Sequence, residues 1–352
     1  MARNGGLPAI VHPDMATIAA INRLMKEQGL KRVSQAALRL QRQRCGRGFR
    51  FVDASGATIR DGETLARLKS LAMPPAYINV RYASDPRAHL QATGEDAAGR
   101  LQYRYHPDWL AIRETVKAGR LRDLARSLPR IRRSVSRALG GEACDSRYAA
   151  AAAVRLVMKA AIRAGNDAYA RERGTRGATT LLKSNVEIDG VTVRLRFRAK
   201  GAKTVAREVK DKRLAGALGT LLSLPGRRLF QYRGENDTIR QLRAHEVNAF
   251  LREISGRAVS LKDFRTLLAS ASVMDSLSAL APAPTKRLQK AAVRDAIVAA
   301  SETLANTPTV CRKSYVHDSV IAAYEEGRLP RRTPRSLERQ AMALARVVAR
   351  HA

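Results

Sequence analysis

The sequence contains little cysteine and few large aromatic residues. Its three cysteines, Cys45, Cys144 and Cys311, stand far apart, and none belongs to a CxxC pair or a Cys/His cluster. This pattern supports neither a disulfide framework nor a zinc site. Because the chain has one tryptophan and six phenylalanines, its core has to be built mainly from alanine, leucine, valine and isoleucine.

Long apolar runs and nucleotide-binding loops are also missing. No stretch approaches the roughly 18 apolar residues of a membrane span, and the first fifteen residues lack the apolar core of a signal peptide. No GxxxxGK[ST] run is present, so no nucleoside triphosphate site is indicated, and no acidic triad suggests a metal site. We therefore expect an intracellular protein that is independent of membranes, metals, nucleotides and other cofactors.

Positive charge dominates the composition. Lysine and arginine total 65 against 31 acidic residues, which gives a formal net charge of +34. Because a field of this size attracts polyanions and releases their counterions, nucleic acid is the expected partner. A ribosome-type or merely soluble basic protein is the alternative. The length of 352 residues suits two domains.

Period-2 patterns predict a strand-rich N-terminal domain over residues 1–108. A short helical pattern in residues 16–44 has Gly29 as its stop, residues 49–59 suggest a hairpin around Ser55-Gly56, and residues 77–82 alternate as a strand does. Pro107 and Trp109 mark the predicted boundary, since proline removes a ladder donor and the residues beyond it turn helical.

A second predicted hairpin, within residues 89–106, is a candidate DNA-binding surface. It places Gln102 and Arg104 on one strand face and Tyr103 on the other. Such side chains could lie in a DNA groove. Alternation alone is equally consistent with a half-solvated sheet.

The remaining residues, 109–352, predict a mostly helical domain with a small sheet and a basic C-terminal tail. An alanine-rich helix, capped by Asp145 or Ser146, is expected to run through Ala164, with Arg163 on its outer face. Apolar residues alternate over 186–209, and Lys200 sits at a hairpin tip within them. Ser260 can cap a helix whose first turns carry Arg265. The predicted fold class is α+β.

The most distinctive stretch is NTPTVCRKSY, residues 306–315. It combines an amide donor, Asn306, with a turn at Thr307-Pro308, two cations and Tyr315. A tyrosine with its ordinary pKa of about 10 is a poor nucleophile at neutral pH. Attack on a phosphodiester therefore needs fixed cations for the non-bridging oxygens and a proton donor for the departing sugar oxygen.

Four ordered motifs together resemble the type IB DNA topoisomerases in their compact bacterial and poxvirus-like form. They are IRAGNDAY (162–169), FRAK (197–200), KDFRT (262–266) and NTPTVCRKSY (306–315). HLQATG (89–94) and GRLQYRYHP (99–107) resemble a strand pair of the bacterial members. The resemblance covers roughly residues 45 to 327.

This resemblance implies a mechanism and a set of roles. Tyr315 would attack and form a 3′-phosphotyrosyl link, while Arg163 and Arg265 would hold the phosphate oxygens. Lys200 would protonate the 5′ oxygen, although Lys203 could compete for that role. Asn306 stands where many relatives carry histidine, which leaves a neutral donor without an ionisable imidazole.

The resemblance also implies partners and setting. Lys262 would support cleavage, and Tyr169 would touch the DNA backbone. A monomer would close as a clamp on duplex DNA in the bacterial cytoplasm, at the nucleoid, and relax supercoils without ATP or metal.

Two rival functions share parts of this pattern. A tyrosine recombinase would share the Arg, Lys, Arg and Tyr chemistry, but recombinases usually show His-x-x-Arg where this chain has Lys262 to Arg265, and they lack such a strand-rich lobe. A non-enzymatic architectural DNA-binding protein would use only the charge and the second hairpin.

Overall fold

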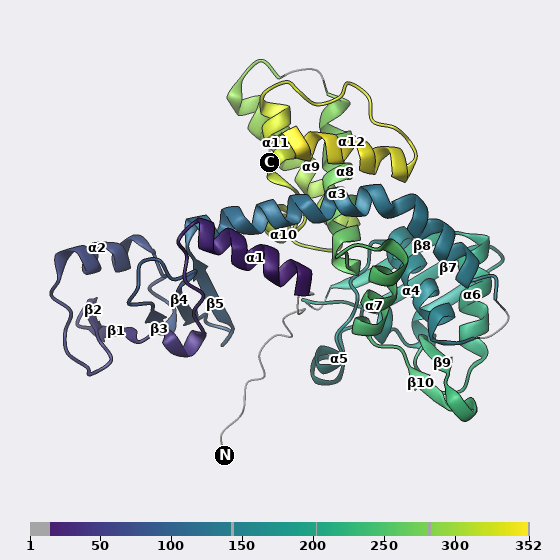
Figure 1. The fold of residues 1–352 in the computed structure, drawn as a ribbon, viewed down its shortest axis with the longest axis horizontal. Helices are drawn as coiled ribbons and strands as arrows, with labels where there is room; N and C mark the ends of the chain where they lie inside the picture. The colour runs from purple at the N-terminus through teal and green to yellow at the C-terminus, as the bar shows by residue number, and fades with distance from the viewer. Residues whose placement is uncertain (1–14, 142–143, 202, 281–282, 351–352) are drawn as a thin grey trace. The chain divides into compact units, whose positions relative to one another are not determined.

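A computed structural model of the chain describes residues 15–141, 144–201, 203–280 and 283–350 (Figure 1). The chain divides into two compact units, one within Pro13–Val116 and the other within Lys117–Ala352. The division falls inside one long helix, α3 (Pro107–Ala138). The first unit is strand-rich and the second is mostly helical with a three-stranded sheet, so the predicted α+β class is confirmed.

The first unit is built on a five-stranded antiparallel sheet of order β2-β1-β3-β4-β5. Leu68 of helix α2 packs with Phe51, Val80 and Tyr82 of the sheet in one apolar cluster. The elements of this unit are α1 (Met15–Glu27), β1 (Leu40–Cys45), β2 (Gly48–Val52), α2 (Gly62–Ser70), β3 (Ile78–Tyr82), β4 (Leu90–Glu95), β5 (Leu101–Tyr105) and the start of α3.

The strand predictions for this unit are partly confirmed. The predicted strand at 77–82 is β3, and the second predicted hairpin is β4 with β5. The predicted hairpin around Ser55-Gly56 is present in a short form: the amides of Asp53 and Ile59 donate to the carbonyls of Ala57 and Phe51, both at 2.9 Å, while β2 pairs along its length with β1. The sequence of β1, LQRQRC, begins with its one large apolar residue, so it carries almost no period-2 signal.

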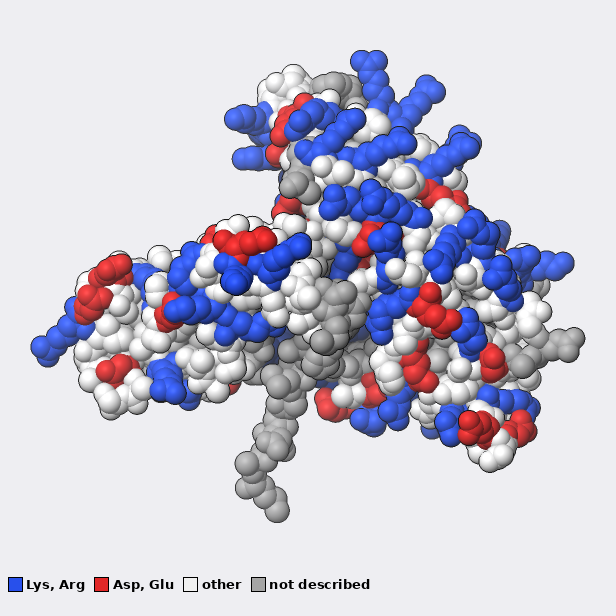
Figure 2. All heavy atoms as spheres, in the orientation of Figure 1, with Lys and Arg blue, Asp and Glu red and all other residues white. Residues whose placement is uncertain are grey.

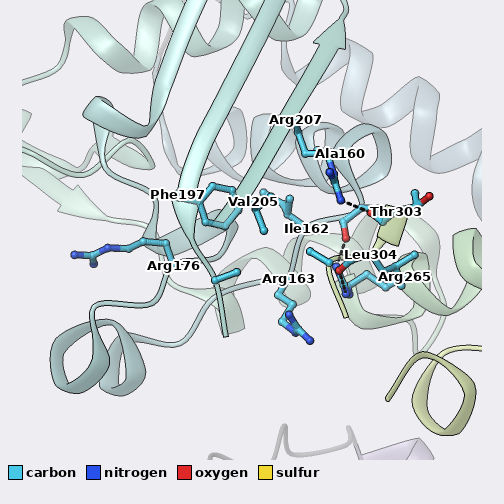
Figure 3. Close-up of a pocket in the computed structure, with 13 residues that line it drawn as sticks. Ala160, Ile162, Arg163, Arg176, Phe197, Val205, Arg207, Arg265, Thr303 and Leu304 are labelled. Atoms are coloured by element: carbon cyan, nitrogen blue, oxygen red, sulfur yellow. Dashed lines mark hydrogen bonds between the residues drawn. The ribbon is translucent and has the colours of Figure 1, made fainter. Parts of the chain in front are cut away.

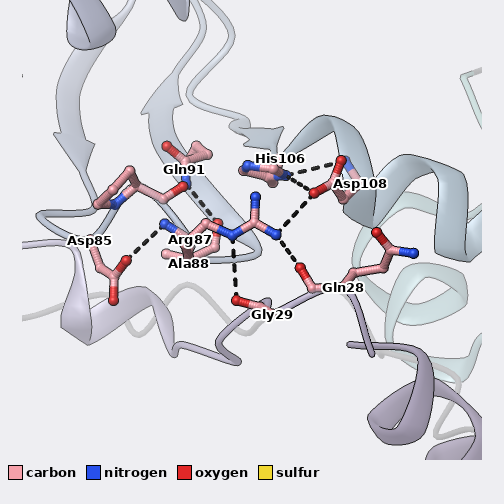
Figure 4. Close-up of polar contacts among 9 residues, drawn as sticks. Gln28, Gly29, Asp85, Arg87, Ala88, Gln91, His106 and Asp108 are labelled. Atoms are coloured by element: carbon pink, nitrogen blue, oxygen red, sulfur yellow. Dashed lines mark hydrogen bonds and ion pairs between the residues drawn. The ribbon is translucent and has the colours of Figure 1, made fainter. Parts of the chain in front are cut away.

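Arg87 ties three segments of the first unit together (Figure 4). Its guanidinium donates to the backbone carbonyls of Gln28 and Gly29 after α1, and it lies 3.1 Å from a carboxylate oxygen of Asp108 at the start of α3. The backbone amide of Asp108 donates to His106 Nδ1 at 3.1 Å. These contacts fix the start of α3 against the sheet within this unit.

The second unit packs around helix α4 (Ser146–Ala160). Asp145, one of the two predicted caps, caps the helix by accepting a 2.8 Å hydrogen bond from the amide of Tyr148. Five alanines, Ala149 to Ala153, are at most 2 % exposed, which lets neighbouring elements approach closely. The other elements are α5 (Asp167–Arg173), β6 (Val186–Asp189), β7 (Thr192–Arg198), β8 (Thr204–Lys210), α6 (Lys212–Ser223), β9 (Gln231–Arg233), β10 (Ile239–Gln241), α7 (Ala244–Ser255), α8 (Leu261–Ser278), α9 (Lys286–Thr303), α10 (Pro308–Ser314), α11 (Asp318–Glu325) and α12 (Leu337–Arg350).

Helix α4 ends four residues earlier than the sequence predicted. Its last residue is Ala160, and Ala161 adopts the left-handed conformation with φ 54°. A non-glycine residue in this region costs of order 1 kcal/mol or more and persists only where its surroundings enforce it. Arg163 therefore lies on the irregular segment beyond the helix rather than on a helix face.

Basic side chains occupy the displayed surface of each unit, with smaller acidic patches between them (Figure 2). Within the described ranges, every helix is too short or too polar to cross a bilayer.

Candidate active site

Tyr315 is held at the end of a short capped helix. The Thr307 hydroxyl accepts from the amide of Val310 at 3.3 Å, and Pro308 occupies the first turn of α10, where its missing N–H costs nothing. Tyr315 follows the last residue of α10 and is 8 % exposed. The turn predicted at Thr307-Pro308 lies at residues 304–306 instead, and the helix predicted to begin near Tyr315 begins at Pro308, before the tyrosine.

Ser270 of α8 anchors the backbone around this tyrosine. Its hydroxyl donates to the carbonyl of Tyr315 at 3.0 Å and accepts from the amide of His317 at 3.0 Å. Ser270 is fully buried. Helix α8 therefore fixes the main chain on both sides of Val316.

Arg265, five residues earlier on α8, lies against the tyrosine ring. Its Cζ atom is 4.7 Å from the ring centroid of Tyr315, and the side chain is 2 % exposed. The guanidinium also donates to the carbonyl of Ala161, just after α4, and to that of Leu304, just after α9, the latter at 3.0 Å. A cation at two helix C-termini is favourably placed with respect to both helix dipoles.

Arg163 and Asn306 meet beside this pair. Arg163 Nη2 donates to Asn306 Oδ1, and Asn306 is 4 % exposed. Asn306 follows Ala305, whose φ is +49°. Asn306 Nδ2 and Arg265 Nε are both buried and have no hydrogen-bond partner among the residues that the structure describes. Two polar donors of this cluster are therefore still available to an acceptor.

Close backbone packing supports the segment that carries Arg163. The amide of Ala178 donates to the Arg163 carbonyl at 2.7 Å. A Cβ atom on Gly177 would lie 2.7 Å from that carbonyl oxygen and 2.5 Å from the amide nitrogen of Gly165. Only glycine fits at 177, so this residue type is required for the course of the arginine segment.

The pKa of Tyr315 lies below its ordinary value of 10.0. Burial raises it, but the positive charges of Arg265 and Arg163, with a smaller contribution from Lys262, outweigh the burial. Burial lowers the pKa of the Arg265 guanidinium, which nevertheless stays charged because arginine starts above 12. The site therefore makes the phenolate form of its tyrosine easier to reach than in a free tyrosine.

A small pocket adjoins the cluster (Figure 3). Arg163 and Arg265 lie on one side of it, whereas Arg176 points away from both. Phe197 and Val205 line the pocket from strands β7 and β8. The three-stranded sheet thus borders the residues around Tyr315.

Lys200 does not join this cluster. It is exposed in the turn between β7 and β8, and its Nζ lies 5.7 Å from the ring centroid of Tyr169 on α5. The Tyr169 ring also contacts Arg173, with 5.1 Å between its centroid and the arginine Cζ. Lys203, from the same turn, reaches the cluster instead and donates to the backbone carbonyl of Asn306 at 2.7 Å.

The remaining candidates are spread over both units. Lys262 is exposed in the first turn of α8, where its charge acts on Tyr315. On β5, Gln102 donates to Asp96 at 2.9 Å and Arg104 donates to the carbonyl of Ala72 at 3.2 Å. Tyr103 is 36 % exposed and stacks on Tyr105.

Sequence reasoning missed two residues that support the cluster, Arg207 and Ser270. Arg207 leaves a signal, because it occupies an apolar position of the β8 alternation, between the buried Val205 and Val209. Ser270 leaves a weak signal, because it is a polar residue among buried apolar neighbours on α8.

Among the described residues, no group of three or more His, Cys, Asp or Glu side chains has the arrangement of a metal site. The cluster consists of cations, an amide and a phenol. Such a donor set is suited to an anion and offers no ligand set for a divalent cation.

Comparison with known proteins agrees with this chemistry. Residues 111–338 match the family model described as eukaryotic DNA topoisomerase I, catalytic core, and residues 48–96 match bacterial DNA topoisomerase IB, N-terminal domain. The DNA topoisomerase 1B of Acanthamoeba polyphaga mimivirus is 27 % identical over 284 residues, covering 79 % of this chain and 84 % of the viral protein. Since the catalytic-core match spans more than half of the chain, the protein belongs to the type IB DNA topoisomerases, isomerases whose substrate is DNA.

Proposed function

We propose that Tyr315 is the nucleophile of this topoisomerase. Its phenolic oxygen attacks a phosphorus atom of one strand, the bond from phosphorus to the 5′ oxygen breaks, and a 3′-phosphotyrosyl link forms. The observation that carries this assignment is the Arg265 guanidinium 4.7 Å from the Tyr315 ring. The same cation that favours the phenolate is close enough to meet the phosphate that the phenolate attacks.

Arg163, Arg265 and Asn306 bind the non-bridging oxygens in this proposal. Charge grows on those oxygens in the transition state, so donors fixed in advance lower the barrier. The buried and unpartnered Arg265 Nε and Asn306 Nδ2 atoms support this role. Lys262 adds a further positive charge at the start of α8.

Lys200 supplies the proton to the departing 5′ oxygen. Its exposed side chain lies beside Tyr169 at a hairpin tip, so the side chain has to turn from Tyr169 toward the phosphate when DNA binds. Active-site hydrogen bonds of a free enzyme often form only in the complex with substrate. Tyr169, on this proposal, exchanges its contact with Lys200 for the DNA backbone.

The strand-rich unit completes a clamp around duplex DNA, with Gln102, Tyr103 and Arg104 of β5 toward the groove. We propose that one copy of the chain suffices, that it needs neither nucleoside triphosphate nor metal, and that it acts on the bacterial nucleoid. The positive charge of the chain, +34, supports a grip made mostly of phosphate contacts.

Relaxation of a supercoiled plasmid by Tyr315→Phe tests the nucleophile. We expect no relaxation but unchanged affinity for duplex DNA, because the substitution removes only the phenolic oxygen. Tyr324→Phe is the matched control, as this tyrosine on α11 is also 8 % exposed. If Tyr315→Phe relaxed plasmid at the parent rate, the assignment would be wrong.

A further inference from the structure

The β7–β8 hairpin holds the end of helix α9, which leads to the tyrosine segment. Arg207 Nη2, on β8, donates to the carbonyls of Glu302 at 3.0 Å and Thr303 at 2.6 Å. Lys203 Nζ donates to the carbonyl of Asn306 at 2.7 Å. Two cations from one hairpin therefore bind this backbone, Arg207 at the last residues of α9 and Lys203 in the turn that follows it.

Lys203 lies much closer to the hairpin tip than Arg207. The turn that contains Lys200 is closed by a 2.8 Å hydrogen bond from the amide of Ala199 to the carbonyl of Lys203. The Lys203 backbone thus forms the base of the tip, and its side chain joins that base to Asn306. Arg207 holds the hairpin four residues further along β8.

The turn after α9 does not depend on Lys203 for its own shape. The amide of Asn306 donates to the carbonyl of Ser301 at 2.9 Å, Arg265 binds the carbonyl of Leu304, and Arg207 binds those of Glu302 and Thr303. Removing the Lys203 amine leaves all of these bonds in place. The element released by such a change is the tip that carries Lys200.

We propose that Lys203 is a positioning residue for the general acid: bonded to Asn306, it fixes the hairpin tip so that Lys200 reaches the departing 5′ oxygen at the phosphate bound by Arg163 and Arg265. The proposal rests on the proposed role of Lys200. In this proposal Lys203 holds the hairpin tip in position and transfers no proton itself.

Leaving-group chemistry separates these roles. When the bond from phosphorus to the 5′ oxygen breaks, its electron pair stays on oxygen, which takes a proton from Lys200. A 5′ sulfur in that position departs as a thiolate without protonation, because thiols ionise near pH 8.5. A variant that cleaves slowly because it lacks the acid should therefore cleave the sulfur substrate at the wild-type rate. A variant with an impaired nucleophile or impaired phosphate binding should stay slow on both substrates.

The experiment measures single-turnover cleavage of duplexes that differ only in 5′ oxygen or 5′ sulfur at the scissile phosphate. We expect Lys200→Met to slow cleavage of the oxygen duplex by about 100-fold or more, and Lys203→Met by about 10- to 100-fold. Both variants should cleave the sulfur duplex at the wild-type rate. The double variant should be no slower than Lys200→Met on oxygen, since the two residues act in one step.

Two further variants make the test specific. Lys203→Arg keeps a cationic donor to the Asn306 carbonyl, so it should cleave the oxygen duplex within about threefold of the wild type. Lys210→Met removes an exposed lysine at the opposite end of β8 and controls for the loss of one charge. It should cleave both duplexes at the wild-type rate.

Each remaining outcome contradicts a specific claim. Equal slowing of both duplexes by Lys203→Met would overturn the proposal, because Lys203 would then act on the nucleophile or the fold. The proposal would also be overturned if Lys203→Met cleaved the oxygen duplex more slowly than Lys200→Met does and cleaved the sulfur duplex at the wild-type rate. Lys203 itself would then be the acid. A Lys200→Met defect that sulfur does not relieve would instead refute the proposed role of Lys200.

Discussion

The guanidinium of Arg265 stands 4.7 Å from the ring centroid of Tyr315 and simultaneously binds the carbonyls of Ala161 and Leu304. One buried cation thus joins the ends of α4 and α9 to the tyrosine. Arg163 follows Ala161 by two residues and Asn306 follows Leu304 by two, so the same contact sets the course of both segments. Arg265 therefore both holds the backbone of the site together and contacts the tyrosine.

Removing Arg265 should weaken the fold as well as abolish cleavage. Arg265→Ala leaves two buried carbonyls without their charged donor, and hydrogen bonds to charged groups contribute about 1.5–3 kcal/mol each. We expect the free energy of unfolding to fall by about 3 kcal/mol or more in urea titrations. Arg163→Ala is the control, because Arg163 is only half-buried and should cost about 1 kcal/mol. Equal stability losses in the two variants would contradict the joining role of Arg265.

The lowered pKa of Tyr315 should be visible in a titration of ring-labelled tyrosine by NMR. One signal should titrate below pH 10, disappear in Tyr315→Phe and move to higher pH in Arg163→Ala, because that change removes a positive charge that favours the phenolate. A titration in Arg163→Ala identical to that of the wild type would contradict this electrostatic account.

The same shift affects stability with a defined sign. A phenol whose folded-state pKa is depressed contributes stability that is fully present above the unfolded pKa of about 10 and is lost as pH falls through the folded value. The stability difference between the wild type and Tyr315→Phe should therefore move in favour of the wild type as pH rises across that window. Urea unfolding at several pH values measures it.

Ser270 should position the nucleophile without touching DNA. Ser270→Ala removes the hydroxyl that bonds the Tyr315 carbonyl and the His317 amide, so we expect cleavage about 10-fold slower with unchanged DNA affinity. Ser127→Ala is the control, since that buried hydroxyl bonds carbonyls of its own helix, those of Asp123 and Leu124. Wild-type cleavage by Ser270→Ala would show that the anchor is dispensable.

DNA binding should be strongly salt-dependent. If the protein neutralises six to ten phosphates, its affinity for duplex DNA should fall by about 10³ to 10⁵ between 50 and 200 mM salt. Fluorescence anisotropy with an unspecific duplex measures the slope. A flat binding curve over this range would contradict a grip made of phosphate contacts.

Local chemistry explains which features could be predicted from the sequence. The cap at Asp145 and the strands β4 and β5 depend on residues near one another in the chain. The end of α4 could not be predicted in this way, since the left-handed Ala161 depends on a carbonyl contact from Arg265, 104 residues away.

In the candidate site, too, contacts between residues distant in the sequence could not be predicted. Ordered motifs pointed to Arg163, Arg265, Asn306 and Tyr315, and these four lie together in the structure. The contacts of Arg207 and Ser270 are tertiary and join segments that no spacing relates. Strand alternation placed Lys200 at a hairpin tip but carried no information on which lysine of the turn contacts Asn306.

Mapping the covalent adduct tests the central claim most directly. The protein is mixed with a duplex whose cleaved 5′ end cannot be rejoined, digested with protease, and the DNA-linked peptide is sequenced by mass spectrometry. The account predicts a phosphodiester bond between Tyr315 and the 3′ end of the cut strand, and no adduct with Tyr315→Phe. An adduct on any other residue, or on the 5′ end, would contradict it.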